Sequence, residues 1–222
     1  MRWKGILFDL DGTLIDSLPD IVQSVNNLRR GRGLGTLTRG FCLPHIGKGA
    51  DYLIRGVLPQ ITDSTEILRA VAEYQQSYLE LPSRSKPFAG VIKGLSELKV
   101  IFPELRFAVV TNKSTRLAIK TCEEHLSSLS FEVIQGPEKL KARKPAKEHA
   151  DAVLGVMKLD ADEVVICGDD LVDYELAKNI GTSFFAANWG YGKLKLQVSY
   201  SSDFNPCSDF TDFCQKFISK NL

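Results

Sequence analysis

The sequence predicts an α/β fold, in which a parallel sheet is interrupted by an inserted all-helical segment, on three observations. Short apolar runs rich in Val, Ile and Phe alternate with helical patterns, as in successive βαβ units. These runs lack polar alternation, which is expected of strands that are covered on both faces. Between the first and second runs the alternation stops, and residues 16–86 show helical patterns only.

The expected strands are the apolar runs 5–10, 106–111, 131–135, 163–168 and 183–187. The expected helices of this part carry apolar residues at helical spacing, namely Val91 to Leu98, Leu117 to Leu126, Val153 to Met157 and Leu176 to Ile180. Gly181 stands where a helix typically ends in the left-handed conformation.

The inserted segment has helical faces of its own. One runs from Ile21 to Leu28 and another from Ile67 to Tyr78, with Asp63 and Glu66 as a capping start of the second. Pro and Gly mark its two boundaries, near 16–19 and 83–90. We therefore expect a core domain of residues 1–15 and 87–222 and a helical cap domain of residues 16–86.

Composition excludes several classes of function. Lys and Arg number 28 against 27 Asp and Glu, so we expect no binding to nucleic acid or to an anionic membrane. No apolar run approaches the ~20 residues that cross a bilayer, and the start of the chain does not resemble a secretory signal. The five cysteines show no metal-ligand spacing, which favours reduced thiols in the cytoplasm: Cys42, Cys122, Cys167, Cys207 and Cys214.

The stretch FDLDGTLIDS places Asp9 and Asp11 one residue apart where the first strand ends. A strand that ends between them can aim one side chain and one backbone carbonyl at a common point, and Gly12 lets the backbone turn. Such acids repel each other unless a cation lies between them. The pair alone is a weak signal, because solvated acids at strand ends are common.

Other polar residues fall at comparable places. Thr111 and Asn112 follow the second strand and offer a hydroxyl and an amide to a phosphate oxygen, and Lys144 precedes Pro145 at the entry to a helix. Asp169, Asp170 and Asp173 follow another buried strand, where their repulsion requires a cation or a solvated loop.

The strand-borne groups share the C-terminal edge of an open parallel sheet, where ligands bind at the reversal of strand order. Carboxylates, a hydroxyl, an amide and a lysine that converge there predict a site for Mg²⁺ and a phosphate group, because Mg²⁺ prefers oxygen ligands and bridges to phosphates.

The segments DLDGT, TN, KP and GDDLVD, in this order, resemble the four motifs of the haloacid dehalogenase superfamily of phosphotransferases. The similarity covers roughly residues 4–15 and 87–220, and it implies a Rossmann-like parallel sheet core with an inserted all-α cap. IGKGADYLI, KPFAGV, AVVTNKS, KPA and NWGYG resemble the phosphoglycolate phosphatase branch, though related phosphatases share much of this pattern.

The resemblance implies a role for each matching residue. Asp9 is the expected nucleophile, and Asp11 the general acid and base that also lends its backbone carbonyl to Mg²⁺. Thr111 and Asn112 would bind phosphoryl oxygens and Lys144 would neutralise charge. The expected metal ligands are Asp9, Asp11 and Asp169, with Asp173 close by; Asp170 has no assigned role. The implied substrate is a small phosphorylated metabolite, phosphoglycolate-like, for an enzyme that is a monomer or a homodimer.

Lys48 lies between two glycines in the inserted segment, and we expect it to meet an anionic group at the far end of the substrate. A solvated loop lysine is an equally good reading. The histidines receive no role, and His149 is expected on a helix surface. Trp189 and Tyr191 are expected in packing or at the rim of the site.

Other functions stay open on this scaffold, among them a sugar-phosphate mutase, a pyrophosphatase or a phosphatase with another substrate. Thr13 favours hydrolysis over mutase activity, and Asp11 disfavours a dehalogenase, since dehalogenases of the superfamily lack this acid. A phosphonate hydrolase would need a Schiff-base lysine in the cap, for which Lys48 is a formal candidate. A receiver-like phospho-acceptor module fits poorly, because receivers have no helical insertion after the first strand.

Overall fold

The structure is a computed structural model that describes residues 2–138, 142–192 and 204–222. Within these residues a six-stranded parallel sheet has the order β5-β4-β1-β6-β7-β8. Its strands are β1 (Gly5–Phe8), β4 (Arg106–Val110), β5 (Val133–Gln135), β6 (Val164–Gly168), β7 (Ser183–Ala187) and β8 (Phe204–Cys207). The α/β prediction is confirmed, and each expected strand is present. The edge strand β8 was not predicted.

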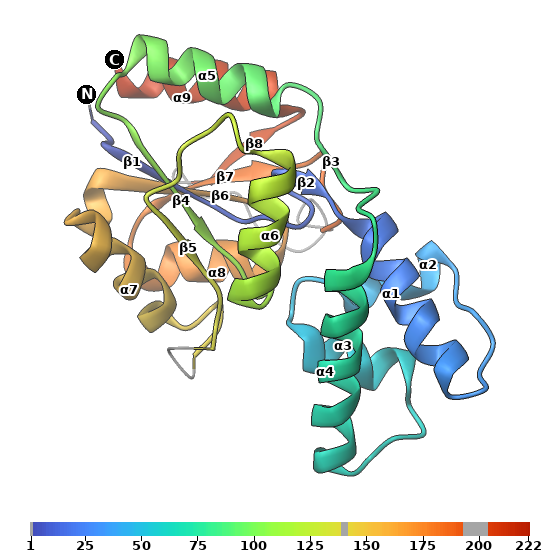
Figure 1. Cartoon of the computed structure of the whole chain (residues 1–222). Coiled ribbons are helices and arrows are strands. Elements are labelled where there is room, and N and C mark those ends of the chain that lie inside the picture. The colour runs from blue at the N-terminus through green and yellow to red at the C-terminus, as the bar shows by residue number, and fades with distance from the viewer. Residues whose placement is uncertain (1, 139–141, 193–203) are drawn as a thin grey trace.

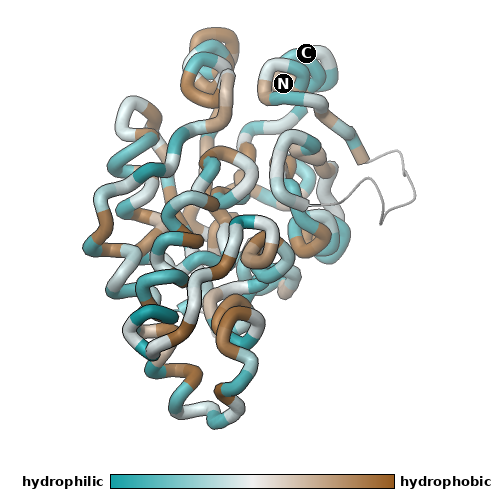
Figure 2. The backbone as a smooth tube through the Cα atoms, turned by 90° about the vertical axis from the view of Figure 1, so that its right-hand side faces the viewer, coloured by the Kyte–Doolittle hydropathy of each residue, from teal (hydrophilic) through white to brown (hydrophobic). Residues whose placement is uncertain are grey.

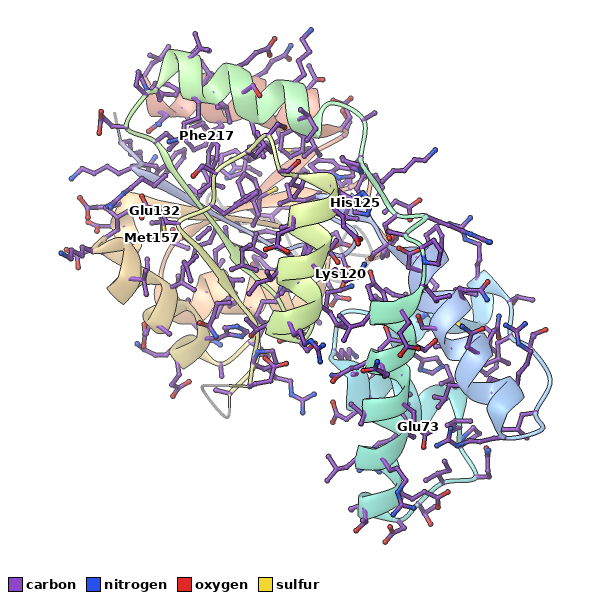
Figure 3. All side chains as sticks on the ribbon, in the orientation of Figure 1. Glu73, Lys120, His125, Glu132, Met157 and Phe217 are labelled. Carbon is purple, nitrogen blue, oxygen red and sulfur yellow. The ribbon has the colours of Figure 1, made fainter. Side chains whose placement is uncertain are left out.

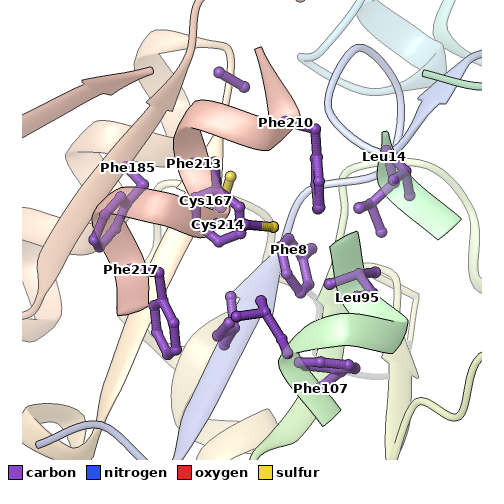
Figure 4. Close-up of a cluster of buried hydrophobic side chains, with 14 of the residues drawn as sticks. Phe8, Leu14, Leu95, Phe107, Cys167, Phe185, Phe210, Phe213, Cys214 and Phe217 are labelled. Carbon is purple, nitrogen blue, oxygen red and sulfur yellow. The ribbon is translucent and has the colours of Figure 1, made fainter. Parts of the chain in front are cut away.

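Helices cover both faces of this sheet (Figure 1). One face is covered by α5 (Val91–Ile101), α6 (Thr115–His125) and α9 (Phe210–Asn221), and the other by α7 (Lys147–Met157) and α8 (Leu171–Ile180). The short helix η2 (Ala161–Glu163) leads into β6. Neighbouring residues of a strand point to opposite faces, so Phe8 packs among the aromatic rings of α9 (Figure 4) while Leu7 joins the cluster under α7 and α8.

The inserted residues 16–86, called the cap segment below, form α1 (Leu18–Gly31), α2 (Arg39–Cys42), η1 (Leu43–His45), α3 (Ala50–Val57) and α4 (Ser64–Glu80). These helices lie to one side of the sheet (Figure 1), and their turns alternate hydrophobic and hydrophilic residues (Figure 2). Their apolar faces form a separate buried cluster, which Leu117 of α6 joins from outside the segment. As expected, Asp63 caps α4 by accepting a hydrogen bond from the Glu66 backbone N–H.

The two linkers of the cap segment lie side by side. β2 (Ile15–Asp16) pairs antiparallel with β3 (Lys86–Pro87). The buried carboxylate of Asp20 accepts hydrogen bonds from the Ser83 hydroxyl at 2.5 Å and from the Arg84 backbone N–H at 2.7 Å. Ser83 in turn contacts Nε2 of His125 at 2.7 Å, at the end of α6 (Figure 3). The linkers are therefore fastened to each other and to the rest of the chain outside the cap segment, called the sheet domain below.

None of the helices in the described ranges combines the length and the apolar character that crossing a membrane requires. The cysteines agree with the expectation of reduced thiols, because all five have free sulfurs and are buried.

Candidate active site

The polar residues predicted to form the site lie where the order of the strands in the sheet reverses. β1 stands between β4 and β6, so the C-terminal ends of these three strands meet at one edge of the sheet. Asp9 follows β1, Thr111 follows β4 and Asp169 follows β6, and all three side chains are buried. The Asp9 backbone N–H donates to the carbonyl of Cys167 at 2.9 Å, which continues the pairing of β1 with β6 and fixes where the Asp9 side chain begins.

Lys144 connects two of the carboxylates. Its Nζ lies 2.5 Å from Oδ1 of Asp9 and 2.7 Å from Oδ1 of Asp173, and its side chain is 2% exposed. Burial alone would lower the pKa of Lys144, but the two carboxylates outweigh burial and raise it. The contacts with Asp9 and Asp173 therefore favour the charged form of Lys144.

The side chain of Asn112 fixes the backbone of Lys144 through hydrogen bonds. Its Oδ1 accepts from the Lys144 N–H at 2.8 Å, and its Nδ2 donates to the carbonyls of Lys144 at 3.2 Å and of Gly47 at 3.0 Å. The side-chain amide is thus engaged with protein groups, and the expected contact with a phosphoryl oxygen stays a prediction. Thr111 accepts a hydrogen bond from the Lys113 backbone N–H at 3.1 Å, and its contact with phosphate also stays a prediction.

The loop that contains Tyr191 and Gly192 passes close to Asp169 and holds its carboxylate. Oδ2 accepts from the backbone N–H groups of Tyr191 at 2.7 Å and Gly192 at 2.9 Å, and Oδ1 accepts from the Thr13 hydroxyl at 3.0 Å. A Cβ on Gly192 would lie 1.8 Å from the Asp169 carbonyl oxygen, so only glycine fits there. Tyr191 therefore lies beside the site, in agreement with the expected position in packing or at the rim. Trp189 donates from its indole N–H to the Thr13 carbonyl.

Asp170 and Asp173 form the start of α8. Asp170 caps the helix by accepting from the Val172 N–H at 3.3 Å, while its own N–H donates to Oδ2 of Asp173 at 3.0 Å. This capping box gives Asp170 a structural task that the sequence left open. It also directs the other oxygen of Asp173 toward Lys144.

Asp9, Asp169 and Asp173 form one buried acidic group, in which one oxygen from each lies within 4.8 Å of the others. Burial raises the pKa of Asp9 to about 7 against the opposing effect of Lys144, and it raises the pKa of Asp169 well above the usual range. One ammonium, that of Lys144, cannot balance three ionised carboxylates, and a divalent cation with oxygen ligands would allow all three to stay ionised. The donor set therefore fits a magnesium-like ion. The Asp11 side chain is not in this group.

Asp11 has a different cationic partner, which the sequence analysis missed. Nζ of Lys113 lies 2.9 Å from Oδ1 and 3.3 Å from Oδ2 of Asp11, and it also donates to the hydroxyl of Tyr78 at 2.9 Å. Burial acts to lower the pKa of Lys113, but Asp11 and Tyr78 outweigh it and the pKa is raised. The available signal was the position of Lys113 directly after Thr111 and Asn112.

A pocket of about 50 Å³ opens beside Asp9 and Asp11. Its other lining residues include Thr111 and Lys113 from the sheet domain and, from the cap segment, mostly apolar side chains with Tyr74 and His45. The cap segment thus forms one wall of the pocket. It also contacts the sheet domain through the ion pair of Arg143 with Asp51 at 2.5 Å.

Lys48 does not line this pocket. Its Nζ lies 5.0 Å from the centre of the Tyr52 ring, and the residue lines a neighbouring cavity of about 550 Å³ together with Asp170. Contact between Lys48 and a substrate stays a prediction.

The expected surface position of His149 is wrong. The residue is completely buried at the start of α7, where Nε2 contacts the Gln135 carbonyl at 3.2 Å. Burial and the nearby charge of Lys144 lower its pKa to about 4. The helical periodicity of this stretch did not predict that its polar residue faces the sheet.

Comparison with known proteins agrees with this fold and site. The model of the haloacid dehalogenase-like hydrolases matches residues 6–187. Phosphoglycolate phosphatase of Cupriavidus necator is 32% identical over 190 residues, which cover 84% of this chain and 81% of that protein. N-acetylmuramic acid 6-phosphate phosphatase of Pseudomonas aeruginosa is 28% identical over 192 residues, with 86% and 84% covered.

A solved structure described as a predicted phosphoglycolate phosphatase from Haemophilus somnus superposes with a TM-score of 0.84 over 97% of this chain and 98% of that one, at 24% identity. The chain belongs to the haloacid dehalogenase-like hydrolase family. Within that family it is a phosphatase, similar to the phosphoglycolate phosphatase branch. The resemblance of the four motifs to this family is thereby confirmed.

Proposed function

We propose that this phosphatase uses Mg²⁺ and an aspartyl-phosphate on Asp9 to hydrolyse a small phosphorylated metabolite that resembles phosphoglycolate. The observation that carries the proposal is the buried ion pair of Lys144 with Asp9 and Asp173, set beside Asp169. A dianionic phosphate reaches a carboxylate nucleophile only where positive charge surrounds both.

The side chains of Asp9 and Asp169 and the backbone carbonyl of Asp11 would hold the ion, with Asp173 beside them. A bound Mg²⁺ would supply positive charge against the phosphoryl oxygens. Lys144 supplies a second positive charge from the protein itself, and its contact with Asp173 keeps it in place. Thr111 and Asn112 would complete the phosphate surroundings.

The reaction would proceed in two displacements. A carboxylate oxygen of Asp9 bonds to phosphorus as the bond from phosphorus to the ester oxygen breaks, and Asp11 gives a proton to that leaving oxygen. Water then bonds to phosphorus while its proton passes to Asp11. The bond between phosphorus and Asp9 breaks, which releases phosphate and restores both carboxyl groups.

The pocket supports binding of a substrate between the sheet domain and the cap segment, because residues of both line it beside Asp9 and Asp11. The relatives differ in substrate, since their names specify phosphoglycolate in one and N-acetylmuramic acid 6-phosphate in another. We propose that residues 16–86 act as a cap domain on a core of residues 1–15 and 87–222, which their separate hydrophobic cluster supports. Cytoplasmic location and a monomeric or dimeric state stay predictions.

The test is release of free phosphate from a panel of small phosphate esters, sugar phosphates and pyrophosphate, with Mg²⁺ or with EDTA. Asp9→Asn should lower turnover at least 10³-fold and should fail to form an acid-stable phosphoenzyme. Asp151→Asn, a change of the same kind on the exposed side of α7, should leave turnover intact. Unchanged turnover in Asp9→Asn would exclude Asp9 as the nucleophile. Hydrolysis of pyrophosphate as the fastest reaction would favour a pyrophosphatase, and isomerisation of a sugar phosphate would favour a mutase.

The proposed role of Asp11 has its own test. Asp11→Asn should lower turnover of alkyl phosphates more than that of aryl phosphates, because an aryl oxide leaves without a proton more easily. An equal loss on both would argue against the acid role. Lys48→Ala with an unchanged KM for carboxylated phosphates would remove Lys48 from substrate binding.

A further inference from the structure

Lys113 is a second buried lysine of the site, and its contacts differ from those of Lys144. Its side chain is 5% exposed, and it contacts Asp11 and Tyr78, whereas Lys144 contacts Asp9 and Asp173. Within the described residues each lysine therefore pairs with different carboxylates of the site. Lys144 serves the nucleophile, and Lys113 serves the residue proposed to move the proton.

The contact with Asp11 fixes its orientation. Both carboxylate oxygens of Asp11 lie within 3.3 Å of the same ammonium, so rotation of the carboxylate would break at least one of these contacts. Asp11 follows the end of β1 and precedes Gly12, whose φ is 92°, and strand pairing does not by itself fix this side chain. Proton transfer needs the carboxyl group within hydrogen-bond distance of the leaving oxygen, so its orientation bears directly on the rate.

The third partner comes from the cap segment. Tyr78 stands on α4, its hydroxyl accepts from Lys113 at 2.9 Å, and its ring centre lies 4.1 Å from the same Nζ. Tyr78 is 5% exposed and shields the ammonium from water. The attraction between Lys113 and Asp11 is several-fold stronger without water than in water, so it depends on α4 lying against the loop after β4.

We propose that Lys113 is a positioning residue that holds the Asp11 carboxyl group for proton transfer, and that Tyr78 makes this hold depend on the contact of the cap segment with the sheet domain. The inference rests on the proposed function of Asp11. Activity would then depend on the contact of the cap segment with the sheet domain, since departure of α4 would remove one partner of Lys113 and admit water to the pair.

The experiment compares Lys113→Met with Asp11→Asn on an alkyl phosphate and on p-nitrophenyl phosphate. Lys113→Met should lower kcat on the alkyl ester at least 10-fold and on the aryl ester less than 3-fold. KM and inhibition by inorganic phosphate should change less than 3-fold. In an Asp11→Asn background, Lys113→Met should cause no further loss, because the lysine acts through that carboxylate.

Tyr78→Phe keeps the ring and removes the hydroxyl, and it should give the same leaving-group pattern at 3- to 10-fold. Lys120→Met, which removes a half-buried lysine of α6 that pairs with Glu124 (Figure 3), is the control and should leave turnover of both esters unaffected. Thermal unfolding of each variant checks the fold, and Lys113→Arg, which keeps the charge, should recover part of the alkyl rate if Lys113→Met unfolds.

Equal loss on both esters, or a further loss in the Asp11→Asn background, would overturn the inference and make Lys113 a substrate-binding residue. These outcomes differ from failure of the proposed function, which would appear as turnover retained in Asp9→Asn.

Discussion

The hydroxyl of Tyr191 donates a 2.6 Å hydrogen bond to Oδ1 of Asp16, in the first linker of the cap segment. The same hydroxyl accepts from the Leu18 N–H at 2.9 Å. The backbone N–H of Tyr191 donates to Asp169 at 2.7 Å. One residue therefore joins the acidic group of the site to the start of α1, with its backbone on one side and its side chain on the other.

Tyr191→Phe should separate these two contacts. The backbone bond to Asp169 remains, so the affinity for Mg²⁺ should stay within 2-fold, while the lost hydroxyl should lower the free energy of unfolding by about 1–2 kcal/mol. Titration calorimetry and urea unfolding measure the two quantities. A large loss of Mg²⁺ affinity would mean that the hydroxyl, and not the backbone, holds the Asp169 region.

Mg²⁺ should stabilise the folded protein through the acidic group. At an ion concentration 100 times the Kd, the free energy of unfolding should rise by about 2.7 kcal/mol, because the ion binds the folded chain only. Thermal unfolding with Mg²⁺ and with EDTA measures the shift. Asp169→Asn should abolish it and Asp151→Asn should not, and an equal shift in both variants would place the ion elsewhere.

His149 should make stability depend on pH. Its pKa falls from the ordinary 6.5 to about 4 on folding, so between these values the unfolded chain binds a proton that the folded chain does not. Its contribution is fully present above pH 6.5 and is lost as the pH falls toward 4, by about 3 kcal/mol in total. Urea unfolding of the wild type and of His149→Gln from pH 7 to pH 4 measures this contribution, and parallel curves would contradict it.

The same substitution at Gly192 and at Gly155 tests how closely the loop of Tyr191 and Gly192 packs against Asp169. Gly192→Ala places a Cβ 1.8 Å from the Asp169 carbonyl oxygen and should cost about 3 kcal/mol of stability. Gly155 lies on the exposed side of α7 with no atom within 4 Å of its Cβ position, so Gly155→Ala should stabilise by about 0.5–1 kcal/mol. Equal denaturation midpoints for the two variants would show that the loop moves aside at little cost.

The sequence predicted the acidic group better than its surroundings. Asp9 and Asp169 directly follow apolar strands, and the geometry of parallel sheets brings such positions together. Lys113 carried no comparable pattern, because a single loop lysine is usually solvated and only the fold reveals Tyr78 above it. The strand β8 was missed because its four residues include Pro206, which strands seldom contain. His149 was misplaced because helical periodicity locates an apolar face and does not show which polar residues it also buries.

The paired linkers β2 and β3 and the Asp20 hydrogen bonds that fasten them have an evolutionary consequence. The cap segment enters and leaves the sheet domain through a single narrow stalk, and none of Asp9, Lys144, Asp169 or Asp173 lies within the segment. Helices beyond the stalk can be lengthened or reshaped while the four groups keep their positions, as long as Tyr78 of α4 keeps its contact with Lys113. Substrate preference and phosphoryl chemistry can therefore diversify at separate rates in descendants of one ancestral gene.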